Sequence, residues 1–200
     1  MEYPIENVIN KLNKDEFNVF LPVLKIGAMK PIEVLEKIKS EHTLIKKHIK
    51  ENFVINSGDF NFHKKIIELT SGQIITTNYD NAFEKASNGL ITPSIYTDKF
   101  NKSQINKSNE PYIFKLHGSY IEPSNCIIFE EDYNKLYDSN SEAIEKLKTI
   151  FAEKTILFLG FSFNDPDINL IFKNLDKAFD NNNNKHLRKF IFKKIKLNWL

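Results

Sequence analysis

Three short apolar runs, each followed at once by a polar cluster, constrain the fold of this chain more than any other feature. The runs lie at residues 73–77, 112–116 and 155–159 and are rich in β-branched and aromatic residues, which favours strands. Stretches with helical periodicity separate them. This alternation predicts an α/β fold with a Rossmann-like, mostly parallel sheet flanked by helices.

Polar residues suited to ligand binding stand at the ends of the three runs. They are Thr77, Asn78 and Asp80 after the first; His117, Gly118 and Ser119 after the second; and Gly160 and Ser162 after the third. Because ligands of parallel sheets bind outside the carboxyl ends of the strands, we expect these clusters to converge in one cleft. Each cluster alone also has a structural interpretation: a helix cap, a structural histidine and a strand-to-helix turn.

His117 is the histidine to which we assign chemistry, because it follows an expected strand and precedes a glycine. At a pocket mouth, an imidazole with a pKa near ~6.5 can act as a general base at neutral pH. The other histidines lie in charged helical or tail surroundings, and we expect them to be solvated: His42, His48, His63 and His186.

The remaining elements follow from periodicity and turn signals. We expect helices over residues 5–24, 31–50, 61–70, 79–87, 130–138, 141–152 and 165–179 and a short strand at 126–129. The polar stretch over 89–111 predicts a surface loop or a loose small subdomain on the surface. Pro31 suits a first helical turn, Gly72 suits a helix end, and Ser139 with Glu142 has the spacing of a capping box. The tail from residue 186 to 200 fits either a last strand or a frayed extension.

These elements indicate one α/β domain over residues 1–180. Its helical part covers 1–70, its sheet core with the polar clusters covers 71–180, and an Asn-rich turn and tail follow at 181–200.

Composition excludes several classes of function. None of the six glycines forms a G-x-G-x-x-G or G-x-x-x-x-G-K-[ST] motif, so both glycine-rich phosphate loops are absent from these 200 residues. The single cysteine, Cys126, excludes an internal disulfide framework and a cysteine-rich zinc site, and it fits a reducing cytoplasm. A formal charge of +2 argues against dedicated nucleic-acid binding, and the longest apolar run, at 156–161, is too short to cross a membrane.

Taken in order, the motifs resemble those of a known family. Thr76-Thr77-Asn78-Tyr79-Asp80, Lys115-Leu116-His117-Gly118-Ser119 and Gly160-Phe161-Ser162 are similar to elements of the sirtuin-like NAD-consuming domain of bacterial anti-phage defence proteins. The resemblance covers about residues 60–175. It implies a cytoplasmic, Rossmann-type domain that takes NAD as its substrate and hydrolyses the nicotinamide–ribose bond.

The same resemblance implies roles for individual residues. Asn78 would hold the water or the nicotinamide ribose, Asp80 would support the nicotinamide pocket, and His117 would be the general base at the ribose. The residues that would contact the NAD molecule elsewhere are Thr77, Gly118, Gly160 and Ser162. The product is ADP-ribose or a cyclic form of it, and the partners that this family suggests are a second copy of the chain or a fused or separate sensor protein.

Two departures from the family pattern bear on activity. Without the four cysteines of a zinc ribbon, the chain favours NAD hydrolysis over protein deacylation, and we expect no bound metal. Because no strand with a glycine-rich loop precedes Thr76, we expect a chain truncated at its N-terminus, with weakened NAD binding.

Two other functions remain as alternatives. The chain is a catalytically impaired fragment or non-catalytic interaction module with the same fold, or it is an esterase-like hydrolase. The segment from Gly160 to Asn164 nearly matches the G-x-S-x-G nucleophile elbow, but its last glycine is replaced by Asn164 and the sole histidine after Ser162 is His186.

Overall fold

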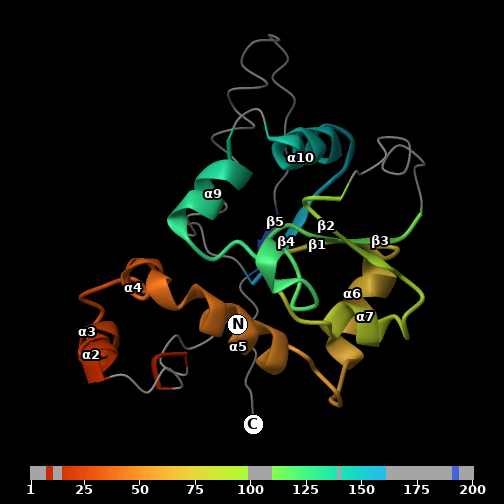
Figure 1. Cartoon of the computed structure of the whole chain (residues 1–200). Coiled ribbons are helices and arrows are strands. Elements are labelled where there is room, and N and C mark those ends of the chain that lie inside the picture. Colours follow the sequence, from red (N-terminus) through yellow and green to blue (C-terminus); the bar gives the residue numbers. More distant parts are fainter. Residues whose placement is uncertain (1–7, 11–14, 99–109, 139–140, 161–190, 194–200) are drawn as a thin grey trace. The chain divides into compact units, whose positions relative to one another are not determined.

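The computed structural model describes residues 8–10, 15–98, 110–138, 141–160 and 191–193 (Figure 1). The chain forms two compact units, Met1–Tyr133 and Asn134–Leu200. In the described ranges, no helix has the length and hydropathy needed to cross a bilayer.

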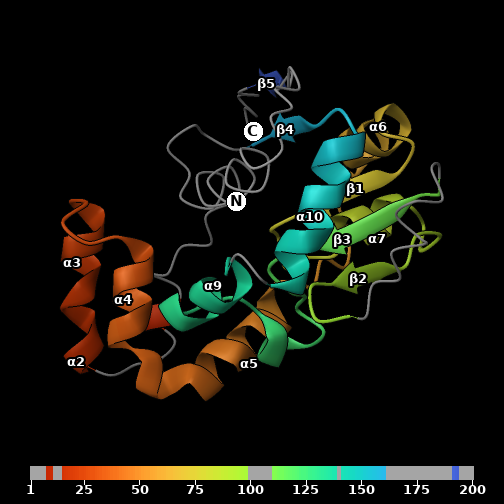
Figure 2. The ribbon, with the colours of Figure 1, turned by 90° about the horizontal axis from the view of Figure 1, so that it is seen from above.

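The first unit contains a three-stranded parallel sheet in the order β1-β3-β2, which Figure 2 shows from above. Its strands are β1 (Gln73–Thr76), β2 (Pro93–Ile95) and β3 (Tyr112–Lys115). In the register, Lys115 at the end of the central strand pairs with Thr76 on one side and Ile95 on the other. The parallel α/β sheet predicted from the sequence is therefore confirmed.

Strand β2 lies inside the stretch that we expected to be a surface loop, and that expectation is wrong for Pro93–Ile95. Proline at the first position of an edge strand removes no hydrogen bond that the sheet needs. The three-residue strand is too short for a periodic pattern to indicate it.

Helices α6 (Asn61–Leu69) and α7 (Ala82–Ala86) pack on this sheet. Ile66, Ile67 and Phe83 of the two helices contact a buried cluster of Ile74, Ile91 and Ile113. Helix α6 ends as predicted before Gly72, which has φ +75°, and a Cβ there would lie 2.6 Å from Cβ of Pro111. Glycine therefore allows both the turn and the close approach.

The N-terminal part is helical, but in shorter pieces than expected: α2 (Asp15–Asn18), α3 (Phe20–Lys25), α4 (Pro31–Lys37), the 3₁₀ helix η1 (Lys39–Glu41) and α5 (His42–Asn52). The predicted helix over 5–24 is interrupted after Asn18, because Pro22 has no N–H to donate to the Asn18 carbonyl. The predicted helix over 31–50 is divided by η1, and Val34 of α4 lies in the same buried cluster as Ile45 and Ile49 of α5. Pro31 begins α4 as expected.

The strand expected at 126–129 is absent from the structure, which has the 3₁₀ helix η2 (Pro123–Asn125) before it and α9 (Glu130–Leu136) after it. The N–H groups of Ile128 and Phe129 donate to the carboxylate of Asp132, at 3.1 and 3.0 Å. The carboxylate of Asp132 therefore satisfies these two donors at the start of α9, and neither of them joins a sheet.

The second unit contains α10 (Glu142–Glu153) and two strands, β4 (Leu157–Leu159) and β5 (Ile191–Lys193). The N-cap of α10 is Ser141, whose Oγ accepts from the Ile144 N–H at 3.2 Å, and not Ser139, which lies outside the described residues. Strands β4 and β5 pair in parallel, so at 191–193 the tail is a strand. The helix expected over 165–179 lies outside the described residues.

Candidate functional site

The loops that follow β1 and β3 are joined by main-chain hydrogen bonds. The N–H of Leu116 donates to the carbonyl of Thr76 at 2.9 Å, and the N–H of Tyr120 donates to the carbonyl of Tyr79 at 3.0 Å. The structure therefore brings the first two of the three predicted polar clusters side by side at the carboxyl end of the sheet.

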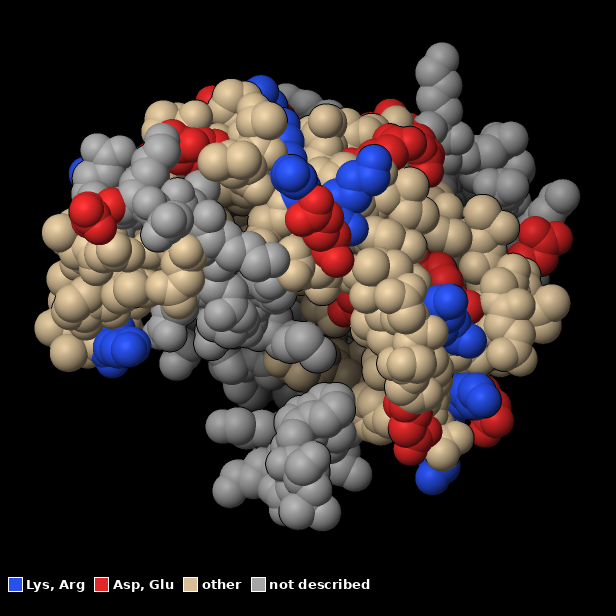
Figure 3. Space-filling view, turned by 60° about the horizontal axis from the view of Figure 1, so that its bottom comes forward, with Lys and Arg blue, Asp and Glu red and all other residues tan. Residues whose placement is uncertain are grey.

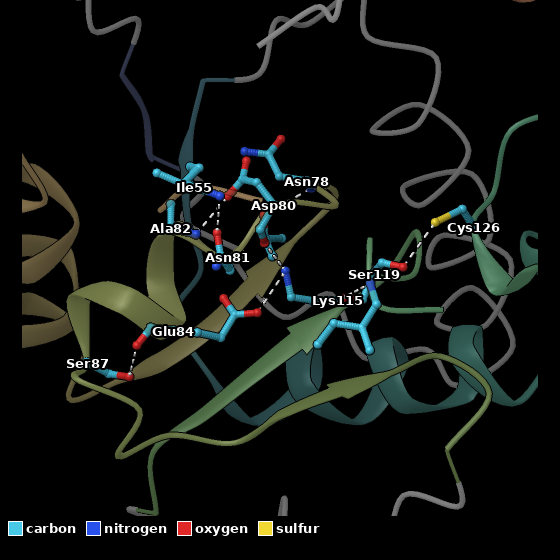
Figure 4. Close-up of polar contacts among 12 residues, drawn as sticks. Ile55, Asn78, Asp80, Asn81, Ala82, Glu84, Ser87, Lys115, Ser119 and Cys126 are labelled. Carbon is cyan, nitrogen blue, oxygen red and sulfur yellow. Dashed lines mark hydrogen bonds and ion pairs between the residues drawn. The ribbon is translucent and has the colours of Figure 1, made fainter. Parts of the chain in front are cut away.

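In the first cluster, Asn78 is exposed, while Thr77 and Asp80 are half-buried. The N–H of Asn78 donates to Oγ1 of Thr76 at 3.1 Å, and Oδ1 of Asp80 accepts from the N–H of Ala82 at 2.9 Å (Figure 4). Asp80 therefore binds the N–H of the first residue of α7, but the N-cap residue is Asn81, whose side chain makes no cap bond. The Asn78 carboxamide stays accessible to a ligand.

In the second cluster, His117 is buried, with 4% of its surface exposed, and its ring packs edge-on against Tyr133 with centroids 5.4 Å apart. Desolvation lowers the pKa of His117 to about 3. This differs from the expected imidazole at a pocket mouth with an ordinary pKa. At neutral pH the ring is uncharged, which is the form that accepts a proton.

Gly118 and Ser119 are also buried. Gly118 has φ +90°, and a Cβ there would lie 2.5 Å from the carbonyl oxygen of Asn125. The carbonyl of Ser119 accepts a hydrogen bond from Sγ of Cys126 at 3.4 Å. Burial raises the pKa of the Cys126 thiol to about 12, so this cysteine remains a neutral thiol.

The third cluster belongs to the second unit. Gly160 follows β4, is exposed and has φ +79°, while Ser162 lies outside the described residues. The convergence of this cluster with the other two remains a prediction.

The expectation that the other histidines are solvated is wrong for His48. It is 5% exposed and lies on the same face of α5 as the buried Ile45 and Ile49, and its Nδ1 is 3.2 Å from Nδ2 of Asn52. His63 is half-buried beside Phe83, and desolvation lowers its pKa.

Sequence reasoning missed a buried ion pair beside the first two clusters. Nζ of Lys115 lies 3.1 Å from Oε1 of Glu84, and the Lys115 side chain is wholly buried. The signal in the sequence was a single lysine within the apolar run of β3. A strand buried on both faces rarely tolerates an unpaired charge, so the lysine itself indicated a carboxylate or carbonyl partner.

A hollow lies beside the loop of the first cluster, and its lining contains both an acidic and a basic residue. The hollow has a volume of about 650 Å³, and its lining includes Asn81 before α7, Lys85 of α7, Pro93 of β2 and Tyr120 after β3. On the face shown in Figure 3, acidic and basic side chains are interspersed, as the near balance of charge in the sequence leads one to expect.

Among the described residues, no group of three or more His, Cys, Asp or Glu side chains could hold a metal ion.

A parallel sheet flanked by helices, with polar loops at its carboxyl end, is a Rossmann-like α/β domain. Residues 72–194 match the SIR2-like domain family, and since this is more than half of the sequence, the chain belongs to that family.

Three relatives illustrate the similarity. The chain is 33% identical over 135 residues to NAD(+) hydrolase ThsA of Acinetobacter baumannii. This match covers 66% of the present chain and 27% of the relative. It is 30% identical over 126 residues to NAD(+) hydrolase ThsA of Bacillus cereus, covering 62% and 26%. It is 31% identical over 129 residues to Defense-associated sirtuin 2 of Bacillus subtilis, covering 62% and 12%. The chain thus spans about a quarter of the length of the hydrolases, and less of the third relative.

Proposed function

We propose that this chain carries the site of a bacterial NAD⁺ hydrolase that acts in anti-phage defence and releases nicotinamide and ADP-ribose. The observation that carries the proposal is the hydrogen bond between Tyr120 and Tyr79, which joins the loop of Asn78 to the loop of His117. Membership of the SIR2-like domain family and similarity to proteins named NAD(+) hydrolase support it.

In this proposal the exposed Asn78 carboxamide holds the attacking water or a hydroxyl of the nicotinamide ribose. Asp80 supports the pocket for nicotinamide, and the neutral imidazole of His117 accepts a proton from the ribose. A base with a pKa of about 3 needs a proton donor that becomes acidic during the reaction. A ribose hydroxyl meets that need, because positive charge develops on the sugar as the bond to nicotinamide breaks.

We further propose that these 200 residues bind NAD weakly. They contain no glycine-rich phosphate loop. Hydrogen bonds to a charged group contribute about 1.5–3 kcal/mol each. Lacking two of them lowers affinity by about a hundredfold or more, since each 1.4 kcal/mol is about tenfold. The proposed source of further contacts to NAD is a second copy of the chain or a sensor protein. We also propose that the protein acts in the cytoplasm and that its reaction needs no zinc.

The test is release of nicotinamide at millimolar NAD, followed by chromatography, which also separates ADP-ribose from a cyclic product. We expect slow release by the wild-type chain and a fall of at least about a hundredfold in His117→Ala and in Asn78→Ala. Asn61→Ala, at the exposed start of α6, is the matched control and should keep the wild-type rate.

Equilibrium dialysis with NAD separates the outcomes. Binding of NAD without any release would favour the non-catalytic module over the hydrolase. Release that persists unchanged in both His117→Ala and Asn78→Ala would place the reaction elsewhere and contradict the proposal.

A further inference from the structure

Lys115 is a charged residue in the most enclosed position of the sheet. Its side chain is wholly buried at the end of the central strand, flanked in register by Thr76 and Ile95. Lysine is almost never fully buried unless its ammonium is paired. Figure 4 shows that the ammonium donates a hydrogen bond to the backbone carbonyl of Asp80 and forms an ion pair with the carboxylate of Glu84.

Lys115 and the Asp80 carbonyl that it binds both lie in segments that carry the proposed site. Asp80 lies two residues after Asn78 in the loop that follows β1, and Lys115 lies two residues before His117. Lys115 therefore connects the segment that presents Asn78 to the strand that leads into His117. The side chain of Asp80 is fixed as well, because it accepts a hydrogen bond from the N–H of Ala82.

We infer that Lys115 is a positioning residue: its hydrogen bond to the Asp80 carbonyl holds the Asn78 loop in place against the strand that leads into His117. The inference rests on the proposed NAD hydrolysis for its catalytic consequence. Lys115 itself need not touch the substrate.

Glu84 has a different task in this arrangement. Its side chain is 16% exposed on α7, and its Oε1 lies 3.1 Å from the ammonium, so it balances a charge that would otherwise be buried alone. Glu84 compensates the burial of Lys115, whereas the Asp80 carbonyl is the link to the loop. The two effects can be separated by mutation.

Stability alone does not account for the pair. Apolar side chains of similar volume commonly replace a buried ion pair without loss of stability, since both charges must be taken out of water. A buried pair at the junction of two motif loops is better explained by the geometry that it imposes.

The test is the double variant Lys115→Met with Glu84→Leu, which removes both charges and keeps apolar volume. We expect a melting temperature close to that of the wild type. We also expect kcat for nicotinamide release to fall by about tenfold to a hundredfold, more than KM changes, because small displacements of catalytic groups are costly. Lys64→Met, at an exposed lysine of α6, is the control for loss of one lysine and should keep wild-type kcat.

Hydrogen exchange supplies a readout that does not depend on turnover. In the double variant, amides of residues 77–82 should exchange faster, while those of β3 should keep their protection. If the wild-type chain releases no nicotinamide but this local loss of protection occurs, the positioning role stands and the proposed hydrolysis fails. A double variant with wild-type kcat and wild-type exchange at 77–82 would overturn the inference.

Glu84→Gln is the second variant, for the case in which the double variant does not fold. Glutamine keeps the volume of the side chain and removes its charge, and the bond of Lys115 to the Asp80 carbonyl is kept. We expect kcat within about threefold of the wild type, since a factor of ten would correspond to about 1.4 kcal/mol of lost transition-state stabilisation. A fall of tenfold or more would show that Glu84, and not the Asp80 link, controls the site.

Discussion

The phenolic hydroxyl of Tyr79 donates a 2.5 Å hydrogen bond to the backbone carbonyl of Ile127, 48 residues further along the chain. The carbonyl of the same tyrosine accepts from the N–H of Tyr120 at 3.0 Å. Tyr79 lies between Asn78 and Asp80, so the two residues with proposed roles flank a side chain that is anchored at its tip and at its backbone.

Tyr79→Phe should therefore lower the free energy of unfolding by about 1 kcal/mol, the usual net contribution of one hydrogen bond. The measurement is unfolding in urea. Tyr112→Phe is the matched control, because among the described residues the structure gives the Tyr112 hydroxyl no hydrogen bond, although the residue is half-buried. Equal losses in the two variants would show that the bond to Ile127 contributes nothing.

Gly118→Ala should destabilise the chain more than an ordinary substitution at a positive φ. The left-handed region costs a residue with a Cβ about 1–2 kcal/mol, and overpacking adds about 1–3 kcal/mol. Gly89→Ala is the matched control: its φ of +73° gives the same backbone strain, but its Cβ would meet no described atom within 4 Å. Urea unfolding should show a larger loss for Gly118→Ala, and equal losses would contradict the packing against Asn125.

Two of the three strands could be predicted, β1 at one edge and β3 in the centre, because each has a signal in its own short segment of sequence. Ile74 and Ile75 in β1 and Ile113 and Phe114 in β3 form apolar runs bounded by turn residues, which indicate strands without knowledge of the rest of the chain. The hydrogen bond from the Ala82 N–H to the Asp80 side chain is local too, since it joins residues two apart.

The features that escaped prediction depend on residues distant in sequence. Lys115 finds Glu84 and Asp80 only once β3 lies beside β1, and His117 is buried only once the chain folds over it. A histidine after a strand looks the same in the sequence whether it lies at the mouth of a pocket or beneath it. Its pKa is therefore a property of the tertiary structure.

Cys126 should be unreactive in the folded chain. It is 3% exposed, and burial raises its pKa to about 12, so both access and the thiolate form are lacking. Because it is the sole cysteine of the sequence, modification by iodoacetamide at pH 8 reports on this site alone. We expect slow labelling in buffer and rapid labelling in concentrated urea, and similar rates in both would contradict the burial.

His117 should make the stability of the chain depend on pH below about 6.5, its ordinary pKa in an unfolded chain. In the folded chain burial lowers this pKa to about 3. Between these two values the unfolded state binds a proton that the folded state does not, so acid favours unfolding. The contribution of the neutral ring is fully present above about pH 6.5 and is lost progressively as the pH falls toward 3.

The expected size follows from one proton. Lowering the pH from 7.5 to 5 should cost the wild type about 2 kcal/mol through this histidine, since each pH unit in that window is worth up to about 1.4 kcal/mol. His117→Phe keeps an aromatic ring against Tyr133 and cannot be protonated, so its unfolding free energy should fall by about 2 kcal/mol less over the same change. His63, whose pKa is lowered in the same direction, is present in both chains and cancels from the difference. Urea unfolding of the wild type and of His117→Phe at pH 7.5 and pH 5 measures this difference. An equal fall in the unfolding free energy of both would mean that His117 is protonated in the folded chain as readily as in the unfolded one.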